Sequence, residues 1–239
     1  MYKKVFDDME ENDHLRKIMS PHAPYSMSPE LFKLVNSLNV QAGKTISIHN
    51  QETPPENELF LKGTGDFHEF FKSFNMSLEE FEAIGKPSIF YALQYLEPQH
   101  KTLFVHNTLT TVEDIQAAQK KLPQTYWATC PNANLYIENR LPNYQVFLDT
   151  NATVTIGTDS LTSNWQLSVL EEMKTILKYQ SYINFEQVLQ WATINGAKAL
   201  SWDEELGSIE VGKNPGLVLI ENIDDTTILT SNSTSRRIA

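Results

Sequence analysis

The feature that most constrains this chain is a repeated order of short apolar strand, polar loop and amphipathic helix. That alternation is typical of an α/β fold with a parallel sheet, because parallel strands need long crossovers that a helix usually supplies. From about Gly207 the pattern changes to glycine turns and an apolar strand with no helix after it, which predicts a small β appendage. The expected parallel strands comprise residues 18–22, 44–49, 101–106, 125–130 and 152–159.

The second expected strand ends in a histidine on the face away from its aliphatic side chains. Because side chains alternate between the two faces of a strand, His49 lies opposite Ile46 and Ile48. In the last expected strand the same alternation places Asp159 opposite the aliphatic residues. Glu52 follows His49 by three residues, beyond the strand, where a loop can swing its carboxyl over the strand end.

The third expected strand is interpreted in the same way. We expect Phe104 and His106 to share the inner face, with Leu103 and Val105 toward the covering helices. The first expected strand ends likewise, in His22. In a parallel α/β barrel the inner face is the interior, and the strand ends form the mouth where catalytic groups collect.

The histidines also have a plain structural interpretation. One histidine at a strand end is more often a hydrogen-bonded structural residue than a ligand. Four strand ends that agree favour a shared site instead. His14, His68 and His100 lie in polar, helical or loop contexts, and we expect each of them at the surface.

The composition indicates which kinds of partner suit the protein poorly. The formal net charge is -11, with 19 Lys+Arg against 30 Asp+Glu, so no basic stripe is available for a nucleic acid or an anionic membrane. No apolar run reaches membrane-spanning length, and the N-terminal residues lack the apolar segment of a signal peptide. The single cysteine, Cys130, cannot form an internal disulfide, which favours a reducing compartment. These observations predict a cytoplasmic protein and make nucleic acids and anionic membranes poor partners.

Five motifs occur in order along the chain: SPHAPYS, HNQE, FVHN, CPNANLYI and IGTDSLTSN. In this order they resemble the second half of the amidohydrolase superfamily, from about Ser20 to Gly216. The resemblance is to its aminohydrolase or deaminase branch, which includes cytosine, guanine, triazine and S-adenosylhomocysteine or aminodeoxyfutalosine hydrolases. It implies a metal-dependent hydrolase of carbon–nitrogen bonds other than peptide bonds, such as a deaminase of an aminated heterocycle or nucleoside.

The resemblance also implies a metal site. His49 would be the metal ligand from the fifth barrel strand and Asp159 the ligand from the eighth, with Asp159 also acting as a base. A single divalent ion is expected. Nitrogen and oxygen ligands suit zinc, and iron(II) is the alternative.

Other residues receive roles from the same resemblance. Glu52 would carry a proton between water and the scissile bond. His106 would orient the water or polarise the substrate in a one-metal site, or bind a second metal in a two-metal site. The residues expected to contact the substrate are His22, Ser163 and Asn164.

One departure from the family pattern is decisive for the expected architecture. The family's first strand carries a His-x-His pair of ligands, and the six histidines of this chain never stand two apart. We therefore expect an α/β fold in which residues 1–206 form strands four to eight of a (β/α)8 barrel. Residues 207–239 would form the C-terminal segment of a small β-sandwich. His49 and Asp159 alone would fall short of the three protein ligands usual at catalytic zinc sites.

A partial barrel would leave strand edges and an apolar interior uncovered. The expected partners are therefore another copy of the chain or a complementing N-terminal half. An enzyme of the amidohydrolase or deaminase type is the leading hypothesis. The alternative is a non-catalytic half-barrel that acts as an interaction or scaffold protein.

Overall fold

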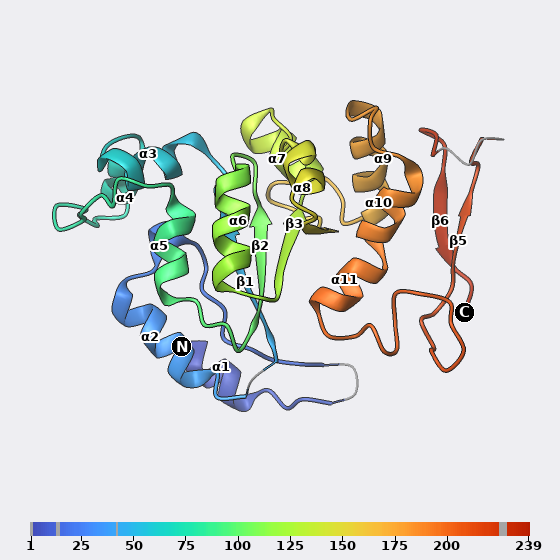
Figure 1. Ribbon diagram of the computed structural model, residues 1–239, viewed down its shortest axis with the longest axis horizontal. Coiled ribbons are helices and arrows are strands. Elements are labelled where there is room, and N and C mark those ends of the chain that lie inside the picture. Colours follow the sequence, from blue (N-terminus) through green and yellow to red (C-terminus); the bar gives the residue numbers. More distant parts are fainter. Residues whose placement is uncertain (1, 13–14, 42, 225–228) are drawn as a thin grey trace.

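A four-stranded parallel sheet forms the centre of the structure, a computed structural model that describes residues 2–12, 15–41, 43–224 and 229–239 (Figure 1). The strand order is β1-β2-β3-β4, so the chain adds each new strand beside the previous one. All three pairings are parallel, as the alternation of strands and helices predicted. The strands are β1 (Thr45–Asn50), β2 (Lys101–His106), β3 (Thr125–Thr129) and β4 (Thr153–Ile156).

Helices follow the strands along the chain, and in Figure 1 they succeed one another from α2 on one side to α10 on the other. Side chains cap some of these helices; Ser28, for example, accepts a hydrogen bond from Leu31 N at the start of α2. No described helix has the length and apolarity needed to cross a membrane. The helices are α1 (Tyr2–Asp8), η1 (Pro24–Ser26), α2 (Pro29–Leu38), α3 (Pro54–Lys62), α4 (Phe67–Ser73), α5 (Ser88–Tyr95), α6 (Val112–Lys121), α7 (Pro131–Glu138), α8 (Tyr144–Asp149), α9 (Val169–Tyr179), α10 (Phe185–Ala192) and α11 (Ile194–Ala199).

One face of the sheet carries the hydrophobic core. Ile46 and Ile48 of β1 are buried on this face, as their alternation with His49 predicted. Phe104 and Trp127 from the next two strands stack there, with ring centroids 4.8 Å apart. The opposite face carries His49 and Val105, which are only partly buried, and their neighbours in register, Ala128 and Thr155, which are buried.

The alternation predicted for β2 is wrong. Ile48 pairs with Phe104 and His49 with Val105, and paired residues in parallel strands point to the same face. Phe104 therefore packs in the core, while Val105 lies on the partly buried face. The expectation failed because an aromatic residue, rather than the neighbouring aliphatic ones, fills the core position in this strand.

The first expected strand, residues 18–22, does not form. This segment runs beside β1, where His49 N donates to His22 O at 2.9 Å. Two residues earlier, however, Ser47 N donates to the Ser20 hydroxyl at 3.3 Å instead of to a backbone carbonyl. The ladder is thus interrupted after one hydrogen bond, and the parallel sheet has four strands rather than five.

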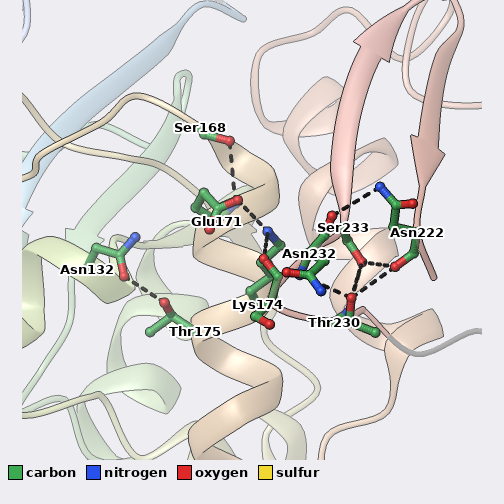
Figure 2. A network of polar contacts seen from close by, with 10 residues as sticks. Asn132, Ser168, Glu171, Lys174, Thr175, Asn222, Thr230, Asn232 and Ser233 are labelled. Carbon is green, nitrogen blue, oxygen red and sulfur yellow. Dashed lines mark hydrogen bonds and ion pairs between the residues drawn. The ribbon is translucent and has the colours of Figure 1, made fainter. Parts of the chain in front are cut away.

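The tail forms an antiparallel hairpin of β5 (Val218–Glu221) and β6 (Thr234–Arg237). Figure 2 shows how the segment before β6 meets α9: Lys174 pairs with Glu171 of its own helix at 2.6 Å and reaches Ser231 O at 3.3 Å. In the same segment, the hydroxyls of Thr230 and Ser233 both donate to Asn222 O, just after β5. The β appendage is therefore present, and its place in a larger β-sandwich stays a prediction.

Candidate functional site

Three predicted site residues converge at the carboxyl ends of the strands. One ligand atom from each of His49, His106 and Asp159 lies within 4.8 Å of the other two. His49 comes from the end of β1, His106 is the last residue of β2, and Asp159 follows β4. Elements far apart in the sequence thus bring two imidazoles and a carboxylate to one place.

The backbone at this cluster adopts unfavourable conformations. His106 has φ 75° and Asp159 has φ 57°, both in the left-handed region that residues with a Cβ rarely occupy. The left-handed turn lets His106 leave the face that its position in β2 would assign it and reach His49, whose ring stacks on it with centroids 5.3 Å apart. Such conformations cost about 1–3 kcal/mol each and cluster at functional sites.

The hydrogen bonds of His49 determine which of its nitrogens faces the site. Nδ1 lies 2.7 Å from the carbonyl oxygen of His22. A carbonyl can only accept, so Nδ1 carries the proton and Nε2 presents a lone pair. His49 is therefore held in the tautomer that a metal ligand requires.

His106 is held in the same tautomer by a different partner. Its Nδ1 lies 3.0 Å from Asn134 Oδ1, while Asn134 Nδ2 donates to His106 O at 3.3 Å. The amide is thus oriented with its oxygen toward the ring, so Nδ1 donates and Nε2 is free. Burial lowers the pKa of His106 below its usual value, which keeps the imidazole neutral.

Glu52, in the loop after β1, lies beside the cluster. Its Oε1 is 3.4 Å from His106 Nε2, and its side chain is 14% exposed. Burial raises the pKa of Glu52 to about 7, with smaller effects from His49, which lowers it, and Asp159, which raises it. A neutral imidazole lone pair that faces a carboxylate oxygen is repulsive unless a proton or a cation lies between them.

The loop that carries Asp159 is held by polar contacts. Ser163 donates its hydroxyl proton to Asp159 Oδ2. Asn164 Nδ2 donates to Thr158 O at 2.8 Å and to the buried Glu172 of α9 at 2.7 Å. These contacts give Ser163 and Asn164 a part in holding Asp159, and their expected contact with substrate stays a prediction.

The remaining histidines are placed differently. His22 is exposed beside the cluster, with its ring 4.9 Å from that of His49, which suits the predicted contact with substrate. The expectation that His100 lies at the surface is wrong: it is fully buried in the turn before β2, where its backbone N donates to Glu97 O. His68 is half-buried and bonded to Gly63 O, and His14 lies outside the described residues.

Cys130 lies near the cluster, but its thiol is buried. It is 1% exposed, and burial raises the pKa of its thiol. A Cβ at Gly157 would come within 3.2 Å of its sulfur, so glycine allows this close approach. A buried thiol with a raised pKa is a packed side chain rather than a nucleophile.

The cluster fits a divalent metal by its donor set. Two imidazoles present lone pairs, their other nitrogens are fixed by oxygen acceptors, and a carboxylate completes the set. Three protein ligands of these types are what catalytic zinc sites commonly provide. His106 thus supplies the third donor that the sequence analysis did not count among the ligands of a single metal.

Sequence reasoning missed the residues behind the cluster. Asn134 fixes the His106 ring, and Glu172 binds Asn132 and Asn164 through both carboxylate oxygens. One signal was available in the sequence: Asn132 and Asn134 lie in the CPNANLYI motif, one of the five that carry the family resemblance. Nothing local marked Glu172, which sits on an ordinary amphipathic helix.

Comparison with known proteins agrees with this geometry. The model of the amidohydrolase family matches residues 3–238. A 5-methylthioadenosine/S-adenosylhomocysteine deaminase of Thermoanaerobacter pseudethanolicus is 28% identical over 215 residues, covering 87% of this chain and 44% of the relative. An adenosine deaminase of Helicobacter pylori is 28% identical over 217 residues, covering 90% and 52%.

A solved structure is similar over the same region. The aminofutalosine deaminase of Helicobacter pylori, in complex with methylthio-coformycin, matches with a TM-score of 0.74 and 25% identity, covering 89% of this chain and 52% of that one. The chain spans about half the length of the curated relatives that it matches.

A parallel α/β sheet with imidazoles and a carboxylate at its strand ends is an arrangement typical of metal-dependent barrel enzymes. The chain belongs to the amidohydrolase family. These comparisons give no support to the alternative of a non-catalytic scaffold, because the relatives are named as enzymes.

Proposed function

We propose that the protein hydrolyses a carbon–nitrogen bond in an aminated heterocycle or nucleoside and releases ammonia. The observation that carries this proposal is the convergence of His49, His106 and Asp159, with Glu52 within reach of His106. The names of the relatives support an adenosine-like substrate, since they act on methylthioadenosine, S-adenosylhomocysteine or adenosine.

We further propose that Nε2 of His49, Nε2 of His106 and the carboxylate of Asp159 hold one divalent ion, with zinc as the first choice and iron(II) as the second. When bound, such an ion makes water acidic enough to lose a proton near neutral pH. His106 acts as a ligand rather than as a hydrogen-bond donor toward the substrate, because its proton is committed to Asn134.

Glu52 is proposed to move the proton. Water attacks the carbon that bears the amino group, its proton passes to Glu52, and Glu52 delivers it to the nitrogen as the carbon–nitrogen bond breaks and ammonia leaves. A carboxyl pKa near 7 suits both steps, because the group can accept and return a proton at neutral pH. His22, exposed beside His49, is proposed to contact the bound heterocycle.

The site is also proposed to be completed by further barrel strands. β1 and β4 are the outer strands of the sheet, and in β1 and β2 the face that carries His49 is only partly buried. Further strands on this side, from the same polypeptide, a second copy or a complementing half, would cover that face.

The test is ammonia release by protein expressed with any sequence that its gene encodes upstream of Met1. Adenosine, 5′-methylthioadenosine and S-adenosylhomocysteine serve as substrates, with and without zinc. The proposal predicts zinc-dependent ammonia release that falls by about 100-fold or more in Glu52→Gln, to a residual rate, and that is abolished by His49→Ala. Release that is unaffected by either substitution would contradict it.

A further inference from the structure

Glu56 is a buried carboxylate outside the predicted site. It lies in the first turn of α3 and is 0% exposed. Its Oε1 accepts a hydrogen bond from Gln51 N at 2.9 Å, its Oε2 accepts one from Glu52 N at 3.0 Å, and Ser88 donates its hydroxyl to Oε1 at 2.5 Å. A buried carboxylate is unfavourable unless such donors satisfy it, so each contact matters.

These contacts form where the chain turns out of β1. Gln51 adopts φ 47°, a left-handed conformation, and its side chain is bonded to Thr110 and Asp114. The peptide N–H groups of Gln51 and Glu52 both point at the Glu56 carboxylate. The direction in which the Glu52 side chain leaves the backbone is thus tied to Glu56.

Glu52 is the residue that links Glu56 to the candidate site. Glu52 Oε1 lies 3.4 Å from His106 Nε2, whereas Glu56 has no contact with any of the three proposed metal ligands among its hydrogen bonds in the described structure. Any effect of Glu56 on the chemistry must therefore pass through the position of Glu52.

We propose that Glu56 is a positioning residue for Glu52. Its two carboxylate oxygens accept hydrogen bonds from the consecutive backbone N–H groups of Gln51 and Glu52, and these bonds hold the Glu52 carboxyl beside the cluster of the three proposed metal ligands. The inference rests on the proposed function, in which Glu52 moves the proton. It differs from a purely structural tie between α3 and β1, because it predicts a specific loss at Glu52.

Two variants distinguish a positioning role of Glu56 from a purely structural one. Glu56→Gln keeps the shape of the side chain but leaves one oxygen, so one backbone N–H faces an NH₂ group instead of an acceptor. Ser88→Ala is the matched control, since it removes a donor to the same carboxylate and leaves both backbone bonds in place.

The first readout is amide hydrogen exchange in the metal-free protein. In Glu56→Gln we expect exchange at Gln51 and Glu52 to accelerate by about tenfold or more relative to amides within β2 and β3. In Ser88→Ala the relative change should stay below about threefold, because both N–H bonds persist. Unchanged exchange at Glu52 in Glu56→Gln overturns the inference, whether or not the protein is an enzyme.

The second readout is kinetic. We expect Glu56→Gln to lower kcat by roughly 10- to 100-fold while KM and zinc affinity change by less than about threefold. In a Glu52→Gln background, the same substitution should have no further effect on kcat. An equal loss in both backgrounds overturns the inference. If the unmodified protein releases no ammonia, the proposed function fails and the exchange result alone decides the role of Glu56.

Discussion

The Asn134–His106 hydrogen bond allows a sharp test of the proposed ligand geometry. Asn134 is 0% exposed and His106 is 1% exposed, and their 3.0 Å contact is what orients Nε2 toward the cluster. Asn134→Ala leaves a buried N–H without its acceptor, which costs about 1–3 kcal/mol of folding stability. Loss of a residue that orients a ligand typically weakens metal binding by about 10- to 100-fold.

Zinc affinity measured by competition with a chelator tests this expectation, and urea unfolding of the metal-free protein measures the stability change. Asn134→Asp is the control, because a carboxylate still accepts from Nδ1 and should keep zinc affinity within about tenfold of the parent. Two results would refute the reasoning: unchanged affinity in Asn134→Ala, or equal losses in both variants.

Three further predictions follow from burial and charge. Phe104→Ala, which removes a fully buried ring stacked on Trp127, should lower the free energy of unfolding by about 3–5 kcal/mol in urea denaturation, and a loss under about 1 kcal/mol would contradict the assigned core. Cys130 should resist a thiol reagent in the folded protein and react on unfolding; rapid native-state labelling would contradict its burial. In metal-free protein, Glu52 holds its proton to higher pH when folded than when unfolded, so its contribution to stability is complete below pH about 4.5 and is lost as pH rises through about 7. Relative to Glu52→Gln, the parent should therefore lose on the order of 3 kcal/mol across that window, and a gain would contradict the assigned shift.

The order of elements was predictable because it rests on patterns along the chain. Short apolar segments that alternate with amphipathic helices identified β1 to β4, and the aliphatic residues of β1 are buried as their spacing required. The segment at residues 18–22 resembled a strand equally well. It does not pair as a strand because Ser47 N of β1 donates to the side-chain hydroxyl of Ser20 rather than to a backbone carbonyl. No sequence pattern predicts that hydrogen bond.

The main residues of the candidate site could be predicted from the sequence. The reason given for His106 at the end of β2, however, was partly wrong. His106 was assigned to the inner face by alternation with Val105, yet Val105 itself lies on that face. His106 arrives there because its backbone turns left-handed at the end of the strand. Left-handed conformations outside glycine depend on tertiary contacts, so strand alternation cannot foresee them.

The residues that hold the site were harder to predict than the residues that form it. Asn134, Glu56 and Glu172 lie on helices and act through hydrogen bonds to groups distant in sequence or to the backbone. Their burial depends on how the helices pack on the sheet. Only the three-dimensional arrangement shows that these polar side chains face inward.

The central claim is that His49, His106 and Asp159 hold one metal ion. The most direct measurement is the anomalous diffraction signal of crystals grown with zinc, compared between the parent protein and His49→Ala. The claim predicts a single peak at about 2.0–2.2 Å from Nε2 of both histidines and from the Asp159 carboxylate, and its loss in the variant. A zinc ion bound elsewhere, or a peak that persists in His49→Ala, would contradict it.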